Sequence, residues 1–347
     1  MRIAIIGGGF CGISVARKLR SHDVFLFDRK DYFEYTPSVH KMAFEREYAS
    51  KIRIPYKQIL NAKIITETIK EVTPEEIMTS KKKYPFDYLV ICSGIDYPIF
   101  LEHKKDVYVL KNGDDALLLN KALQRAESVL VIGGGLIGTE IAAEIAVKAP
   151  TKKLTVVHPY PRLLERNPER ASRHAQRFLE KRKTSFVFGE KVVQHDGKHF
   201  VTDKGTTLTA DIAVWCAGVK CDVRFLKGFT NVLTERGALK VNEHLQLEGY
   251  NNIYSGGDIC SVAEEKTAQN AGKHATIIAK NISRYIHGKP LLSYAPHSGP
   301  MVISLGDYDA ITVIKRWTFT GILQALFKKC IELFEIKKLT LSSRRAK

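Results

Sequence analysis

The sequence predicts an α/β protein in which a second doubly wound, parallel-sheet domain is inserted into a first and is followed by an amphipathic helical tail. Two glycine-rich segments, residues 7–12 and 133–138, each stand between an apolar run of strand length and a helical pattern. Each half then closes with a strand that ends in a turn of small residues, at 92–94 and 216–218. One such glycine pattern is weak evidence, whereas two in this order predict two Rossmann-like units.

The first glycine-rich segment follows the apolar residues 3–6 and opens a helical pattern. In such a turn the first glycine allows a tight bend, the second lets backbone N–H groups approach a pyrophosphate, and the third lets the helix pack on the strand. The anion then lies at the positive end of the helix. We therefore expect a dinucleotide here, contacted by Gly7, Gly9, Phe10, Cys11 and Gly12.

The second segment follows residues 129–132 and has the same form. We expect a second dinucleotide, contacted by Gly133, Gly135, Leu136, Ile137 and Gly138. A chain that holds two dinucleotides at once is suited to electron transfer between them.

The ends of the second strands distinguish the two sites. Residues 24–27 end in Asp28 and Arg29, and an acid at this position can accept both hydroxyls of an adenosine ribose, as in FAD. Residues 154–157 end in His158, with Arg162 nearby, so the acid is missing. These two side chains tolerate a 2′-phosphate, so the second nucleotide can be either NADPH or NADH. The alternative is that His158 only ends the strand and faces solvent.

The remaining turns predict how the two domains are assembled. Residues 1–108 and 233–295 form the first domain, 109–232 the second, and 296–347 a C-terminal segment. Turns of small residues let the backbone pass close to a flat or charged ligand. The expected cofactor contacts in these turns are Ser93, Gly94, Ala217, Gly218, Gly257 and Asp258.

A late helix begins near Ala268 and Gln269, after Thr267. If its first turn faces a flavin, the helix dipole and free N–H groups stabilise negative charge on the reduced ring. The alternative is a solvent-facing cap on a surface helix.

Composition indicates an anionic partner. The chain has 347 residues, 54 Lys and Arg against 37 Asp and Glu, and a net charge of +17. Membrane surface, nucleic acid and cofactor phosphates are the candidates. No apolar run is long enough to span a bilayer, Met1-Arg2 leads straight into a strand, and Arg2 stands where N-myristoylation requires glycine. The six scattered cysteines suit reduced thiols in the cytoplasm, and no metal site is expected.

Together these motifs resemble the pyridine nucleotide-disulfide oxidoreductase superfamily. Within it, the chain is most similar to type II NADH:quinone oxidoreductases and their apoptosis-inducing-factor-like relatives, including ferroptosis suppressor proteins. The resemblance implies a glutathione-reductase-like fold, FAD as cofactor, NADH or NADPH as substrate and quinone as acceptor. It places Glu140 near the nicotinamide and Pro37 in an aromatic-then-proline loop that lines the flavin.

The chain departs from type II dehydrogenases in the late helix, where paired glutamines are replaced by Lys273 and His274. These two residues and Glu140 are the expected catalytic residues. Sulfide:quinone reductases need a redox cysteine pair, which residues 31–50 lack; Cys216 and Cys221 lie elsewhere and are expected to be structural. A soluble ferredoxin or rubredoxin reductase and a nucleic-acid-binding, apoptosis-inducing-factor-like role are the alternatives. No basic stretch interleaved with aromatic residues favours nucleic acid over lipid.

The tail predicts an interfacial helix from Trp317 to Ile336, with apolar residues on one face. From residue 315 onward the chain contains nine Lys or Arg and two Glu residues. Each basic residue near an anionic surface contributes about 1 kcal/mol of binding. We therefore expect a cytoplasmic protein held peripherally on an anionic membrane surface. Packing on the enzyme body or in a homodimer is the alternative.

Overall fold

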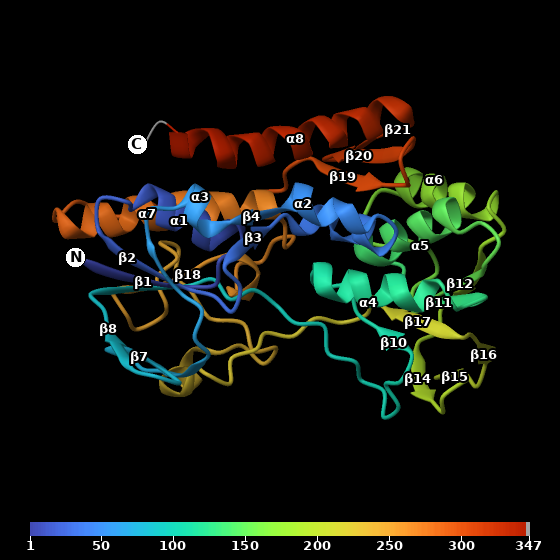
Figure 1. The fold of residues 1–347 in the computed structure, drawn as a ribbon, viewed down its shortest axis with the longest axis horizontal. Helices are drawn as coiled ribbons and strands as arrows, with labels where there is room; N and C mark the ends of the chain where they lie inside the picture. Colours follow the sequence, from blue (N-terminus) through green and yellow to red (C-terminus); the bar gives the residue numbers. More distant parts are fainter. Residues whose placement is uncertain (345–347) are drawn as a thin grey trace.

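The structure, a computed structural model, describes residues 1–344 and confirms the predicted α/β class with two parallel sheets (Figure 1). The first sheet has the strand order β18-β9-β1-β2-β5, and the second has the order β10-β17-β11-β12-β13. The first contains β1 (Arg2–Ile6), β2 (Asp23–Phe27), β5 (Lys63–Ile65), β9 (Tyr88–Ile91) and β18 (Ile253–Ser255). The second contains β10 (Val107–Tyr108), β11 (Ser128–Ile132), β12 (Lys153–His158), β13 (Ser185–Phe188) and β17 (Ile212–Trp215).

Each sheet is the middle of three layers, which is why its strands are nearly continuous apolar runs. In the first half, α1 (Phe10–Lys18) and α7 (Ala268–Ile286) pack on one face. The antiparallel strands β6 (Ile69–Val72), β7 (Glu76–Thr79) and β8 (Lys83–Pro85) cover the other.

The second half repeats this plan. The helices α4 (Gly113–Leu123), α5 (Leu136–Lys148) and α6 (Glu169–Glu180) form its helical layer. The strands β14 (Val192–His195), β15 (His199–Thr202) and β16 (Thr207–Thr209) form an antiparallel sheet on the opposite face.

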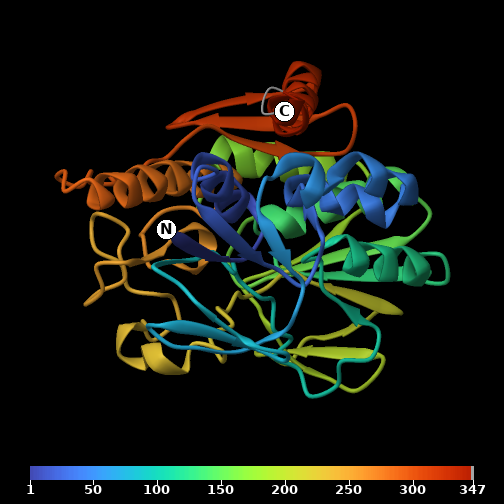
Figure 2. The same cartoon turned by 60° about the vertical axis from the view of Figure 1, so that its left-hand side comes forward.

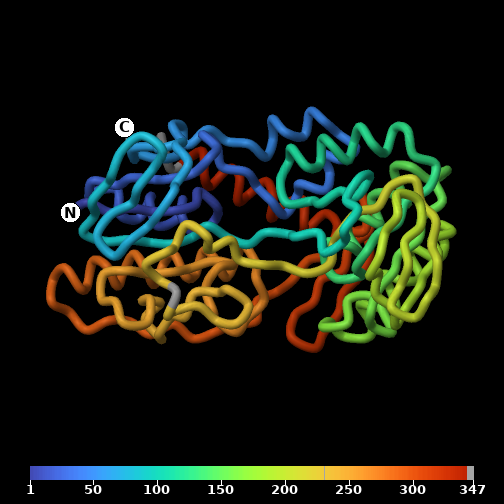
Figure 3. The backbone as a smooth tube through the Cα atoms, turned by 90° about the horizontal axis from the view of Figure 1, so that it is seen from below, coloured from blue at the N-terminus to red at the C-terminus, as the bar shows by residue number. Residues whose placement is uncertain are grey.

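Two antiparallel connections join the halves (Figure 3). They are bridged by Asp96 and Lys220, whose backbone amides bond to each other's carbonyls at 2.7 and 2.9 Å. The second domain is therefore inserted in the first, since β18 returns to the first sheet after β17 has completed the second. β10 already pairs with the second sheet, just before the predicted boundary at residue 109.

Short elements between β2 and β5 build one wall of the molecule. They are β3 (Tyr32–Glu34), η1 (Thr36–Ala43), η2 (Arg46–Tyr48), α2 (Ala49–Ile52), β4 (Arg53–Pro55) and α3 (Tyr56–Ile59). Two further turns of 3-10 helix are η3 (Lys227–Val232) and η4 (Gly257–Ile259).

The C-terminal segment differs from its prediction at the start of the helix. β19 (Met301–Ser304), β20 (Ala310–Ile314) and β21 (Trp317–Thr320) form an antiparallel sheet, and α8 (Ile322–Arg344) follows. The predicted helix was wrong over Trp317–Thr320, where alternating aromatic and β-branched residues favour a strand. Gly321, at φ +106°, separates strand from helix.

The orientation of α8 is also the reverse of the usual amphipathic pattern. The helix lies across the helical layers of both halves (Figures 1 and 2). Ala325, Lys328, Glu332 and Leu339 face the body, whereas Leu323, Leu326, Leu333 and Phe334 are exposed. Polar side chains therefore hold the helix down while an apolar face points outward. Of the basic residues expected in the tail, Arg345 and Lys347 lie outside the described residues.

Candidate functional site

A single cavity of about 2200 Å³ runs from the first glycine turn to α5, β19 and α8. It lies at the carboxyl ends of the strands of the first sheet, where ligands of doubly wound folds bind. Many of the predicted site residues line it: Gly7, Gly9, Phe10, Cys11, Asp28, Arg29, Pro37, Ser93, Gly94, Leu136, Ile137, Glu140, Gly257, Asp258, Ala268, Gln269 and Lys273. Gly12, Gly133, Gly135, Gly138, His158, Arg162, Ala217, Gly218 and His274 are not among its lining residues.

The first glycine turn has the geometry that a pyrophosphate requires. Gly7 has φ +97°, and its amide donates to the carbonyl of Phe27 at 2.8 Å. A Cβ on Gly12 would lie 1.9 Å from the Gly7 oxygen, so the helix packs tightly there. A Cβ on Gly9 would meet nothing within 4 Å, which leaves open space in front of the turn. The turn therefore fits the FAD pyrophosphate.

Asp28 is fixed at the edge of this space. One carboxylate oxygen accepts the amide of Gly8 at 2.7 Å, and the other accepts the amide of Lys30 at 2.9 Å. A carboxylate has further lone pairs, so it can still accept ribose hydroxyls from the cavity.

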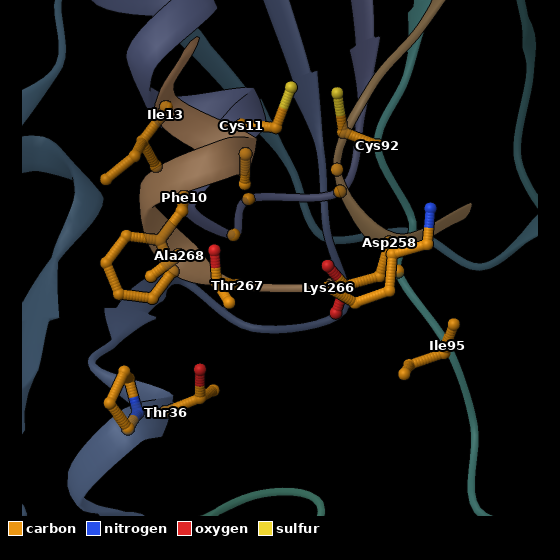
Figure 4. A pocket seen from close by; sticks show the side chains of 18 of the residues that line it. Phe10, Cys11, Ile13, Thr36, Cys92, Ile95, Asp258, Lys266, Thr267 and Ala268 are labelled. Atoms are coloured by element: carbon orange, nitrogen blue, oxygen red, sulfur yellow. The ribbon is translucent and has the colours of Figure 1, made fainter. Parts of the chain in front are cut away.

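The late helix faces the cavity, so the alternative of a solvent-facing cap is wrong. Thr267 accepts the amide of Asn270 at 3.2 Å and thereby caps α7, and Ala268 and Gln269 follow in the lining. Figure 4 shows Asp258 and Lys266 on the same wall. Burial raises the pKa of Asp258, although the Lys266 ammonium opposes this.

Lys273 and His274 have different positions. Lys273 lines the cavity, whereas His274 is 1% exposed and lies behind the wall. Its Nδ1 accepts the amide of Gly257 at 3.0 Å, and its Nε2 lies 3.0 Å from the carboxylate of Glu264. Burial lowers the pKa of His274 to about 4. His274 therefore supports the Gly257 turn as a neutral ring.

Glu140 is held by a residue that the sequence did not indicate. It accepts hydrogen bonds from Lys328 Nζ of α8 and from the Ser304 amide of β19 at 2.9 Å. Burial raises the pKa of Glu140, but the charge of Lys328 and the hydrogen bonds from Lys328 and Ser304 outweigh this and bring the pKa below its ordinary value. The tail thus delivers a cation to the cavity wall beside the second glycine turn.

A second buried polar contact joins α8 to η1. Glu332 accepts Ser38 Oγ at 2.7 Å, Lys41 Nζ at 3.1 Å and the hydroxyl of Tyr48. Its side chain is 7% exposed, and that of Lys41 is 11% exposed. Ser38 and Glu332 both line the cavity, so this contact closes one side of it.

The second glycine turn copies the first. Gly133 has φ +110° and donates to the Val157 carbonyl at 2.8 Å. A Cβ on Gly138 would lie 1.8 Å from the Gly133 oxygen, while one on Gly135 would meet nothing within 4 Å. His158 is buried, so the solvent-facing alternative is wrong for this residue.

The cysteines are free thiols. Cys11 and Cys92 line the cavity together (Figure 4), and contact with Cys92 together with burial raises the pKa of Cys11 well above its usual range. Burial also raises the pKa of Cys216 to about 12. Protonated, buried thiols of this kind are poor nucleophiles.

The family model for pyridine nucleotide-disulphide oxidoreductases matches residues 1–275. The chain is 32% identical to apoptosis-inducing factor homolog B of Dictyostelium discoideum, over 96% of this chain and 94% of that protein. It is 29% identical to ferroptosis suppressor protein 1 of Taeniopygia guttata (97% and 94% covered) and 24% identical to a type II NADH:quinone oxidoreductase of Staphylococcus saprophyticus (97% and 96%).

Solved structures have the same fold. A sulfide:quinone oxidoreductase of Aquifex aeolicus superposes with a TM-score of 0.85 at 20% identity, covering 98% of this chain and 91% of that one. NDH2 of Plasmodium falciparum in complex with NADH also gives 0.85, at 16% identity, covering 99% and 98%. The chain therefore belongs to the pyridine nucleotide-disulphide oxidoreductase family. It is an oxidoreductase with FAD as cofactor and NAD(P)H as substrate.

Proposed function

We propose that the protein is an NAD(P)H:quinone oxidoreductase that works at a membrane surface. The observation that carries the proposal is the continuity of the cavity, which extends from the first glycine turn past Glu140 to the apolar residues of the tail. One relative of similar length is a type II NADH:quinone oxidoreductase, which supports quinone as the acceptor.

When bound, FAD supplies the two-electron chemistry between nicotinamide and quinone, and the chain supplies position and electrostatics. Gly9 and Asp28 fit its pyrophosphate and ribose, and N–H groups in the first turn of α7, which lines the cavity, would stabilise negative charge on its ring. Glu140 stays ionised beside Lys328, and we assign the contact with the nicotinamide to it. To Lys273, which lines the same cavity, we assign the stabilisation of a reduced quinone oxygen.

The end of the cavity under α8 suits a quinone. Val302, Ile303, Phe327 and Ile331 contribute apolar side chains there, and Lys328 contributes a charge. Phe327 is also 47% exposed, so it lies at the mouth between the cavity and the outer surface of the tail. A quinone with an isoprenoid tail could then enter from the side that α8 presents.

The outer surface of the tail fits a membrane interface. Its apolar band consists of exposed residues of β21 and α8: Trp317, Phe319, Leu323, Leu326, Leu333 and Phe334. Lys315, Arg316 and Lys337 are exposed beside it. Apolar and aromatic side chains with flanking cations are typical of segments that lie in the interface plane. No helix within residues 1–344 is long and apolar enough to span a bilayer.

Flotation with anionic vesicles tests this proposal. The triple variant Leu326→Gln, Leu333→Gln, Phe334→Gln should lose vesicle binding and turnover of a long-tailed quinone, but keep turnover of a water-soluble quinone. Leu118→Gln, at a 55% exposed position on α4, is the matched control and should float as the unmodified protein does.

Flotation that is unchanged in the triple variant contradicts the membrane assignment. Sedimentation of the unmodified protein as a dimer, with the triple variant a monomer and neither bound to vesicles, would assign the band to a homodimer instead.

A further inference from the structure

The two halves use different side chains for one contact. In the first half, Asp28 accepts the amide of the middle glycine, Gly8, at 2.7 Å. In the second half, Nδ1 of His158 accepts the amide of Gly134 at 3.0 Å. His158 therefore occupies the position of the ribose-binding acid, but it uses its acceptor nitrogen on the backbone.

This contact determines the tautomer of His158. A nitrogen that accepts an N–H carries no proton, so the proton lies on Nε2. Nε2 lies 3.0 Å from the Glu165 carboxylate and donates to it. Burial lowers the pKa of His158, so the ring is neutral at physiological pH and offers no cation to a 2′-phosphate.

The loop after β12 is built to hold Glu165 in this place. The amide of Leu164 donates to the Gly134 carbonyl at 2.8 Å, and Leu164 takes φ +51°, which a non-glycine residue rarely adopts. The guanidinium of Arg162 donates to the carbonyls of Leu164, Glu165 and Asn167 at 3.4, 2.7 and 2.9 Å. Leu163 and Leu164, which belong to this loop, are buried and anchor it to the protein.

We propose that Glu165 is the ribose acceptor of the second nucleotide site and that the enzyme selects NADH over NADPH. The acid missing from the strand end is supplied seven residues later, beside the second glycine turn. One oxygen of the Glu165 carboxylate accepts from His158, and the other lies 3.7 Å from the exposed guanidinium of Arg166, so the carboxylate still has lone pairs for ribose hydroxyls. Its negative charge disfavours a 2′-phosphate. Arg162 is engaged by backbone carbonyls and acts as a positioning residue. The inference rests on the proposed function only in that the second site binds a nicotinamide dinucleotide.

Binding of two redox-inert probes, measured by titration calorimetry, tests this role. The unmodified protein should bind ADP-ribose about tenfold or more tightly than 2′-phospho-ADP-ribose, the ratio expected from one charge-assisted hydrogen bond. Glu165→Gln should lose most of that preference. Glu169→Gln, at an exposed acid four residues later, removes the same charge and should keep it.

The outcomes separate this inference from the proposed function. Equal preference in Glu165→Gln and the unmodified protein, or a preference of the unmodified protein for the 2′-phosphate, overturns the role of Glu165. Failure of the unmodified protein to bind either probe overturns the second nucleotide site and the proposed function with it. If Glu165→Gln melts early, Glu165→Asp, which keeps the charge but shortens its reach, should give an intermediate ratio; an unchanged ratio contradicts the inference.

Discussion

Removing the carboxylate of Glu332 should loosen the whole tail. In Glu332→Ala, the buried Lys41 ammonium loses its counter-ion, and Ser38 and Tyr48 lose their acceptor. Breaking a buried ion pair from one side costs about 3–5 kcal/mol. The unfolding entropy grows with chain length, so the unfolding temperature of a chain of this size changes by roughly 1.4 °C per kcal/mol, and scanning calorimetry should show a decrease of about 4–7 °C. The KM for quinone should also rise, because Glu332 lines the cavity.

The matched control for the unfolding temperature is Glu335→Ala, one turn along the same helix; Glu335 also lines the cavity, so it does not serve as a control for the KM. Its side chain is 39% exposed and lies 3.9 Å from Lys338, so its loss should cost at most about 1 kcal/mol. Burial raises the pKa of Glu332, but the charge of Lys41 and the hydrogen bonds from Tyr48, Ser38 and Lys41 outweigh this, so the pKa lies below its ordinary value. The stabilisation by Glu332 is therefore present above the unfolded pKa and lost in acid, so the two variants should converge there. Equal melting of both variants at neutral pH would show that the buried contacts of Glu332 add nothing measurable to the stability of the tail.

Three other predictions concern the first glycine turn, Glu144 and Lys273. Gly9→Val should abolish FAD retention, since its side chain fills the open space of the first turn, whereas Gly135→Val should retain FAD and lose nucleotide binding; retained visible flavin absorbance in Gly9→Val would contradict this. Burial raises the pKa of Glu144 to about 7, so ionisation of this carboxyl destabilises the fold as the pH rises from the pKa of the unfolded chain through 7. Glu144→Gln should therefore raise the free energy of unfolding by roughly 3 kcal/mol at pH 8 and by little at pH 4. An effect that does not depend on pH would refute this. Lys273→Ala should chiefly slow reoxidation of the reduced enzyme by quinone in stopped flow, and an equal effect from Lys280→Ala, at an exposed position, would refute the assignment.

Local patterns in the sequence were sufficient for the fold and the first site. Each glycine turn combines an apolar strand, a tight bend and a helix within a short segment, so Gly7, Gly12 and Asp28 could be placed without tertiary information. The return of the chain to the first domain, just before Gly257 and Asp258, could also be predicted, because this segment repeats the pattern of a strand followed by a turn of small residues.

The contacts of the tail could not be predicted, because they join residues far apart in sequence. Lys328 and Glu140 are 188 positions apart, and Glu332 and Ser38 are 294 apart, with no periodicity relating them. Helical spacing identified an apolar face on α8, but it gave no sign that the polar face of this helix has buried partners on the body. Similarly, no acid directly follows β12 in the sequence, but the next loop folds so that Glu165 contacts His158 at the end of this strand. The residues at the strand end alone do not indicate this contact.

The most direct test of the proposed function measures the two half-reactions separately under anaerobic stopped flow. NADH should bleach the visible absorbance of the bound flavin, and mixing the reduced protein with a short-chain quinone should restore it within the turnover time. Reduced protein that quinone leaves bleached, but that ferredoxin reoxidises at the turnover rate, would contradict quinone as the acceptor.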